Sequence, residues 1–320
     1  MSGPIWLSVI IPTYNGSKYL GEALDSVAMQ ADGGVEAILI DDGSTDGTIE
    51  IAKSFQGKLN LEIIERSHVG NWVTGTNIGI ERARGEFLSC LHQDDFWLEG
   101  RVETVKRLIY ESPNASLFLH PSWFVDGSGR FLGIWRCPFA ASPAAILPRD
   151  LVPRLLVQNF ISMPAPVFRR SLATALGGMD RGLWYTADWD LWLKIAGSGT
   201  TVYFPNPLTA FRIHPLSQTI RRGNPEEIRR QLEAVFLRHW ERWDGDALDK
   251  KRIRRLAEAS IELNVMLAGR WSGLFRRMIG FLGVAARLAP SDWREFLRDT
   301  RIWERFRCRA QVFALTPIVR

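Results

Sequence analysis

Two apolar stretches of this chain each end in a pair of aspartates. Residues 35–40 lead into Asp41-Asp42, and residues 87–93 lead into Asp94-Asp95. Apolar runs of this length predict strands buried on both faces of a parallel sheet. Open α/β sheets bind their ligands at the carboxyl ends of such strands. Adjacent carboxylates repel each other and lose hydration there, so we expect a cation or a hydrogen-bonding ligand to compensate them.

Strand and helix patterns alternate through the first half of the chain. This alternation predicts right-handed crossovers and a parallel sheet with helices on its faces. Asp46 stands just before a helical stretch and is the better helix cap there, which leaves Asp41-Asp42 for a ligand. The expected strands cover residues 7–11, 35–41, 61–65, 87–91 and 202–204, and the expected helices cover residues 18–30, 48–55, 74–83 and 188–196.

Composition divides the chain near residue 222. Residues 221–320 hold 22 basic and 13 acidic residues, whereas the remaining 220 residues hold 18 and 22. We therefore expect one domain at residues 1–222 and a basic helical extension at residues 223–320. The three cysteines are widely spaced and indicate a reducing compartment. No stretch resembles a signal peptide or a membrane span, so we expect a cytoplasmic protein.

The residues that follow the first, second and fourth expected strands each have a plain structural interpretation and a functional one. Tyr14 could stack on a base or simply pack in a turn. Asp42 could accept a hydrogen bond from a base or a ribose hydroxyl, or serve as a cap. Asp94 and Asp95 offer the hard oxygen ligands that Mg²⁺ and Mn²⁺ prefer beside a diphosphate, although a solvated loop is the alternative.

A second acidic group lies at the start of a later helical stretch. Asp188 and Asp190 are two residues apart, so on a helix they do not share a face and should do different work. A carboxylate among Trp184, Tyr185 and Trp189 loses water, which raises its proton affinity and suits a general base. The alternative is a carboxylate that interacts only with the helix dipole. His214, next to a proline, is either structural or part of a metal or phosphate site.

In their order along the chain, these segments resemble the family 2 inverting glycosyltransferases of the GT-A fold. The resemblance covers about residues 6–218 and implies a Rossmann-like, mostly parallel sheet flanked by helices, followed by a C-terminal α-helical extension. The segments that carry it are residues 8–15, 40–48, 93–95, 176–180, 187–194 and 212–215, with Gly70, Asn77, Gly79, Ala83 and Gly85 between them.

The resemblance implies a nucleoside-diphosphate sugar donor, a divalent metal (Mn²⁺ or Mg²⁺) and a glycan or lipid-linked acceptor, as in surface polysaccharide or glycolipid synthesis. Asp188 would deprotonate the acceptor hydroxyl in a single in-line displacement with inversion. The other implied roles are nucleotide-sugar binding by Pro12, Tyr14, Asn15, Asp42 and Asp94, metal binding by Asp95 and His214, and acceptor binding or support by Trp184, Trp189 and Asp190.

The chain departs from the family pattern at three points. Ala187 stands where the family often has Glu before the base, so the base needs support from elsewhere, with Asp190 as one candidate. Gln93 replaces the first acidic residue of the second motif. Arg222 stands where processive members have Trp, which favours transfer of a single sugar.

The sequence allows several different partners for the basic extension. One apolar face there could lie on an anionic membrane, placing the protein peripherally on the inner face of the cytoplasmic membrane, but it could equally pack on the core or form a homodimer. A sugar-nucleotide nucleotidyltransferase and a non-catalytic membrane or polyanion adaptor are the competing functions, and we expect no nucleic-acid partner. The apolar face consists of Trp271, Leu274, Phe275, Met278, Ile279 and Leu282.

Overall fold

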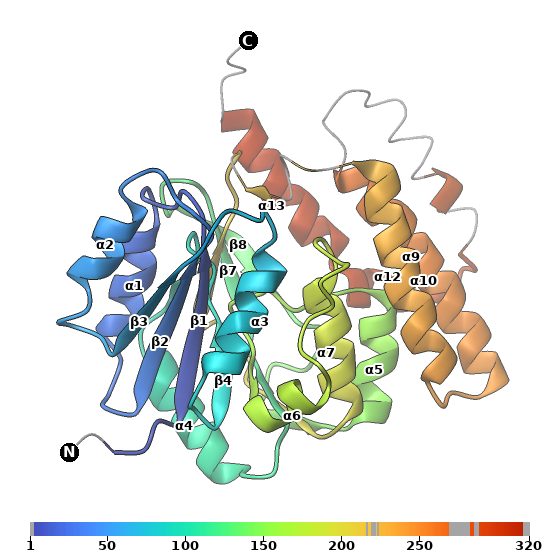
Figure 1. Ribbon diagram of the computed structural model, residues 1–320. Coiled ribbons are helices and arrows are strands. Elements are labelled where there is room, and N and C mark those ends of the chain that lie inside the picture. Colours follow the sequence, from blue (N-terminus) through green and yellow to red (C-terminus); the bar gives the residue numbers. More distant parts are fainter. Residues whose placement is uncertain are drawn as a thin grey trace.

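The computed structural model describes residues 3–215, 217–218, 222, 224–268, 282–284 and 288–315. Its main sheet has eight strands in the order β3-β2-β1-β4-β10-β6-β11-β9, and a second sheet has the order β5-β12-β7-β8 (Figure 1). The main sheet comprises β1 (Leu7–Thr13), β2 (Val35–Asp41), β3 (Leu61–Glu65), β4 (Phe87–Cys90), β6 (Leu117–Leu119), β9 (Ala144–Ile146), β10 (Val167–Arg169) and β11 (Thr201–Tyr203), and the second comprises β5 (Phe96–Trp97), β7 (Ser122–Val125), β8 (Phe131–Trp135) and β12 (Thr209–Arg212).

Helices cover both faces of the main sheet, as expected. Alternate residues of β1 and β2 enter two separate apolar clusters, because successive strand side chains point to opposite faces. One cluster contains α1 (Leu20–Ala28), α2 (Thr48–Ser54) and α4 (Arg101–Glu111). The other contains α3 (Trp72–Arg82), α5 (Pro148–Val157), α6 (Arg170–Ala175) and α7 (Ala187–Gly197).

The mixed α/β fold is confirmed, with one difference inside the first strand. Strands β1 to β4 are mutually parallel where they pair, and β10 is antiparallel to β4 and β6. We expected the first strand to stop at Pro12, but β1 continues to Thr13. Proline is tolerated here because β4 pairs with β1 only as far as Ile10, so beyond it β1 pairs with β2 alone.

Small residues let α3 lie close against the sheet. A Cβ on Gly79 would come within 2.3 Å of Ile10 Cγ2, and one on Gly85 within 2.6 Å of the Ser8 amide nitrogen. Asn77 exchanges two hydrogen bonds with the backbone of Met179, at 2.8 and 2.9 Å. These contacts fasten α3 to the segment that leads into α7.

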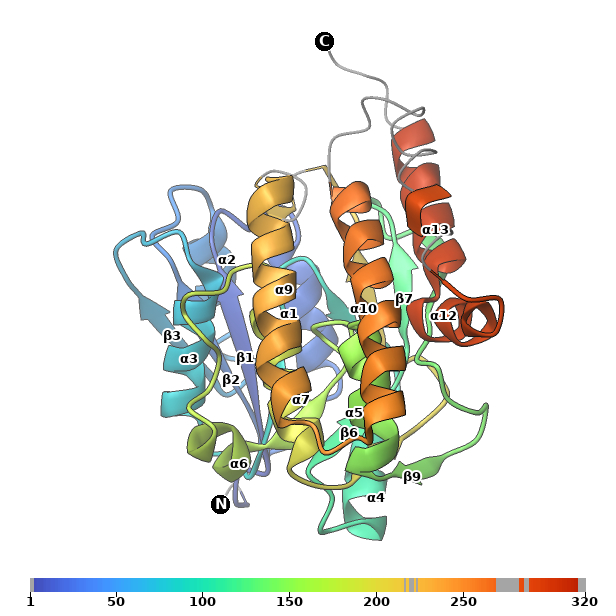
Figure 2. The same ribbon diagram turned by 90° about the vertical axis from the view of Figure 1, so that its right-hand side faces the viewer.

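The described C-terminal helices pack on the preceding part of the chain. Helices α9 (Pro225–Arg242) and α10 (Ala247–Ala268) lie side by side across α5 and α7 (Figure 2). Side chains of α9, α10 and α12 (Asp292–Thr300) belong to the same apolar cluster as α7, and α13 (Ile302–Leu315) packs against β8. The apolar face proposed for membrane binding falls almost entirely at residues 269–281, outside the described residues.

Two expectations about the environment can be compared with this fold. Cys90, Cys137 and Cys308 are free and buried. Among the helices of the described residues, none is long and apolar enough to cross a membrane.

Candidate active site

The carboxyl ends of the parallel strands bring the predicted motifs to one edge of the sheet. Asp41, the last residue of β2, turns back on its own loop, where its carboxylate accepts hydrogen bonds from the amide and hydroxyl groups of Ser44. Asn15 connects the end of the first strand to this loop. Its backbone amide donates to Ser44 Oγ at 2.8 Å, and its side-chain Oδ1 accepts from the Thr45 backbone amide at 2.8 Å. Asp41 and Asn15 therefore shape the two loops.

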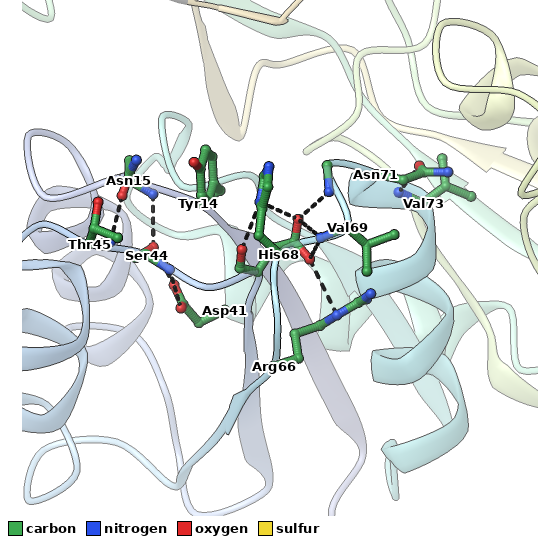
Figure 3. A network of polar contacts seen from close by, with 12 residues as sticks. Tyr14, Asn15, Asp41, Ser44, Thr45, Arg66, His68, Val69, Asn71 and Val73 are labelled. Atoms are coloured by element: carbon green, nitrogen blue, oxygen red, sulfur yellow. Dashed lines mark hydrogen bonds and ion pairs between the residues drawn. The ribbon is translucent and has the colours of Figure 1, made fainter.

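Asp42 organises the loop that follows β3. Its carboxylate accepts hydrogen bonds from the backbone amides of Val69 (3.1 Å) and Gly70 (2.7 Å), and Arg66 and His68 form ion pairs with it (Figure 3). Gly70 has a positive φ of 72°, which glycine adopts without strain. The Asp42 side chain is thus committed to holding residues 66–70 next to Tyr14.

Tyr14 and His68 form a stacked pair at this edge. Their ring centroids are 4.1 Å apart with 24° between the planes, and Tyr14 remains 38% exposed (Figure 3). Gln93 fixes the Tyr14 backbone from the other side, accepting from its amide at 2.8 Å and donating to its carbonyl at 3.1 Å. A carboxylate at position 93 could not make that donation, which gives the unexpected glutamine a physical reason.

The second aspartate pair supplies a candidate cation site. His92, Asp94 and Asp95 each place one ligand atom so that all three atoms lie within 4.8 Å of one another. Asp95 Oδ2 and His92 Nε2 are buried without a hydrogen-bond partner, and coordination of a cation would compensate both atoms. Oxygen and imidazole donors together suit Mn²⁺, and the carboxylates alone suit Mg²⁺.

The pKa values of Asp94 and Asp95 are shifted in opposite directions. Burial raises the pKa of Asp95 well above its usual range, helped by the charge of Asp94 and opposed by the Arg212 backbone amide. Burial also acts on Asp94, but the hydrogen bond from His214 and the nearby His92 outweigh it and hold the pKa of Asp94 below its usual value. A bound cation would relieve the cost of charging Asp95.

The end of β12 and the residues that follow it support this pair. Arg212 donates its backbone amide to Asp95 Oδ1 at 2.9 Å and its Nε to the Asp94 carbonyl at 2.8 Å. Its guanidinium is buried and forms an ion pair with Glu22, so its charge is compensated by a residue of the protein. His214 contacts Asp94 Oδ2 through Nε2 at 2.8 Å. His214 thus lies beside the cation cluster and joins it through Asp94.

Asp188 occupies the first turn of α7 with part of its side chain still exposed. Its Oδ2 accepts a hydrogen bond from Asn159 Nδ2 at 3.0 Å. Burial raises the pKa of Asp188 to about 6, against the opposing effect of hydrogen bonds from the Trp189 amide and Asn159. The expected increase in proton affinity is therefore present, and it suits a group that accepts a proton near neutral pH.

The neighbouring candidates serve the structure around Asp188. Asp190 is fully buried and bonded to Lys194, Arg238 and His239, so it faces away from Asp188 as predicted from the spacing. Trp189 is buried too and donates its indole N–H to the Leu155 carbonyl at 2.7 Å. Trp184 is partly exposed, donates to Glu227 at 2.6 Å, and lies under the Arg222 guanidinium.

Sequence reasoning missed three residues of this site. His92 is one residue before the acidic motif, and an imidazole beside paired carboxylates was an available signal for it. His68 and Asn159 have no local signal, because they reach Tyr14 and Asp188 only through the tertiary fold.

This chain resembles known proteins in sequence and in fold. Residues 8–146 match the family model Glycosyl transferase family 2. An uncharacterised glycosyltransferase of Rickettsia typhi is 27% identical over 235 residues, covering 72% of this chain and 71% of that protein.

Two solved structures share the fold. Residues 1–349 of Staphylococcus aureus TarS, a poly(ribitol-phosphate) beta-N-acetylglucosaminyltransferase, align with a TM-score of 0.66 at 20% identity, over 96% of this chain and 89% of that one. A mannosyltransferase of Pyrobaculum calidifontis, in complex with GDP-Man and Mn²⁺, aligns with a TM-score of 0.53 at 18% identity, over 97% and 88%. Residues 8–146 therefore match glycosyltransferase family 2, and the chain shares the GT-A fold of these two solved glycosyltransferases.

Proposed function

We propose that this enzyme is a metal-dependent inverting glycosyltransferase that moves one sugar from a nucleoside-diphosphate sugar to an acceptor hydroxyl. The observation that carries the proposal is the buried, unpartnered Oδ2 of Asp95 in the cluster with His92 and Asp94. Surface polysaccharides and glycolipids are the acceptor class that we propose.

The donor would lie across the carboxyl edge of the sheet. Tyr14 and His68 offer aromatic faces for the base, and Pro12 lies in β1 two residues before Tyr14. Asp42 contributes by holding residues 66–70 in place, and Asp94 remains exposed enough to reach a ribose hydroxyl. A divalent ion on Asp95 would neutralise the charge that develops on the departing diphosphate.

The acceptor would react beside the start of α7. Asp188 takes the proton of the acceptor hydroxyl, whose oxygen forms a bond to the anomeric carbon as the bond to the diphosphate breaks. A pKa near 6 leaves Asp188 mostly ionised at neutral pH while keeping it basic enough for this proton. Attack from the face opposite the leaving group inverts the anomeric configuration.

Two variants test the donor and acceptor parts of this proposal separately. Asp188→Asn removes the base, so transfer should fall by about 100-fold to 10,000-fold. Thermal stabilisation by UDP with Mn²⁺ should persist in that variant, because the donor site is intact. Asp95→Asn should lose the Mn²⁺-dependent part of that stabilisation.

UDP is the first nucleotide to test because TarS has been solved with UDP and with UDP-GlcNAc, and GDP follows from the Pyrobaculum complex. EDTA should remove the stabilisation and Mn²⁺ or Mg²⁺ should restore it. Equal stabilisation of the wild type and Asp95→Asn by Mn²⁺ would exclude the cation site. Loss of nucleotide binding in Asp188→Asn would contradict the base assignment.

A further inference from the structure

Asp188 has a polar neighbour from a distant part of the chain. Nδ2 of Asn159, two residues beyond the end of α5, donates to Asp188 Oδ2 at 3.0 Å. Ala187 precedes Asp188 but carries no polar side chain, and Asp190 is turned toward α9. Asn159 is therefore placed to orient this carboxylate.

The orientation of the Asn159 amide is itself determined by a second contact. Its Oδ1 accepts a hydrogen bond from the Ile161 backbone amide at 3.1 Å. Since that oxygen must face a donor, the nitrogen end of the planar group faces Asp188. Asn159 thus presents a donor to Asp188 and favours the carboxylate form over the acid.

A buried polar cluster from the C-terminal helices holds this segment in position. Gln158 Nε2 donates to the Asn159 carbonyl at 2.9 Å, while Gln158 Oε1 accepts from Ser260 Oγ at 2.8 Å and Asn264 Nδ2 at 2.7 Å. Asn264 in turn accepts from Arg305 of α13 at 2.9 Å. Gln158, Ser260 and Asn264 are buried, and hydrogen bonds between buried side chains restrict their motion.

We propose that Asn159 is the positioning residue for the base Asp188, and that Gln158, Ser260 and Asn264 fix Asn159 from the C-terminal helices. The proposal rests on the base role proposed above. A base must stay within hydrogen-bond reach of the proton that it removes, and a displacement of about 1 Å can cost about 100-fold in rate. The basic extension would then contribute to catalysis by packing, whatever else it binds.

The proposal predicts a specific change in titration. The groups that lower the pKa of Asp188 after burial has raised it are Asn159 and the backbone amides of Trp189 and Asp188, none of which is charged. Asn159→Ala removes one of these donors and should raise the titration midpoint by about one pH unit. The isosteric Asn159→Asp should raise it further, because it replaces the donor by a like charge.

The experiment follows the Asp188 carboxyl ¹³C resonance with pH in the full chain, assigned by its absence in Asp188→Asn. This readout needs no substrate. In parallel, release of UDP from UDP-GlcNAc with Mn²⁺ and water as acceptor gives kcat and KM against pH. We expect Asn159→Ala to lower kcat by about 10-fold to 100-fold, to move the acid limb upward, and to change the donor KM little.

Matched variants separate positioning from general damage. The exposed Asn114→Ala is the control and should leave both profiles unchanged. Ser260→Ala and Asn264→Leu should shift the Asp188 midpoint in the same direction as Asn159→Ala, by a smaller amount. If the midpoint does not move in Asn159→Ala and Asn159→Asp, or if it moves while kcat stays constant, Asn159 does not position the base. Full transfer by Asp188→Asn would instead refute the proposed function, whatever Asn159 does.

Discussion

Within this site, carboxylates with similar sequence surroundings end in very different states. Asp42 accepts bonds from two backbone amides, whereas Asp95 keeps one oxygen buried and unbonded. Asp188 has a single donating side chain and a raised pKa. A carboxylate saturated by amides has a structural role, and an under-bonded carboxylate is available to an ion or a proton.

At the residue scale, the raised pKa of Asp188 predicts a cost in stability. The folded pKa of about 6 exceeds the ordinary aspartate value of 3.8. Below about pH 4 both states are protonated and the cost is absent; it grows as the pH rises and is complete above about pH 6. Asp188→Asn, a neutral mimic, should therefore stabilise the protein by up to about 3 kcal/mol at pH 7.5 and by almost nothing at pH 4.

Urea denaturation of the wild type and Asp188→Asn at the two pH values measures this difference. Asn114→Ala again provides the control. An equal gain in stability at both pH values would show that the charge of Asp188 is not what destabilises the folded protein.

At the scale of elements, α7 is held against α9 by one buried carboxylate. Asp190 bonds Lys194 of its own helix (2.6 Å) and reaches Arg238 (3.0 Å) and His239 (2.8 Å) of α9. Burial alone would raise the pKa of Asp190, but His239 and Lys194 lower it far below its usual range. The helix that carries the candidate base is thereby fixed to a helix outside the region matched by the family model.

Asp190→Ala should destabilise the protein by about 3–5 kcal/mol, because it leaves buried cations without their partner. Since the folded pKa is depressed, the contribution of Asp190 is present above about pH 4 and is lost as the pH falls below the unfolded value of 3.8. Denaturation at pH 7 measures the loss, with the exposed Asp25→Ala as the control. A loss below about 1 kcal/mol would show that the network does not hold the two helices.

At the scale of the molecule, the composition boundary near residue 222 is not a boundary in packing. One apolar cluster contains Ile10 of β1, Trp192 of α7, Phe236 of α9 and Phe296 of α12. A shared core of this kind makes the parts unfold together. We therefore predict that the two segments expected from composition, residues 1–222 and 223–320, unfold as one unit.

We expect a single calorimetric transition whose van't Hoff and calorimetric enthalpies agree. Phe296→Ala, at a fully buried position, should lower the stability of that one transition by about 3–5 kcal/mol. The exposed Tyr110→Ala, which also truncates an aromatic side chain, is the control and should change it little. Two separate transitions, with only one shifted by Phe296→Ala, would show independent domains.

The sequence by itself determined the parallel strands, their helices and the edge where the motifs meet, because apolar periodicity and strand-end aspartates are local signals. It also indicated the carboxylate pair at 94–95 and the separate roles of Asp188 and Asp190. Only the tertiary structure decided which oxygens are saturated and which are free. The Asp42 carboxylate is bonded to the loop of residues 66–70, and Asn159 orients Asp188. Such contacts join positions about 30 residues apart, and no local pattern encodes a hydrogen bond that depends on how distant segments pack.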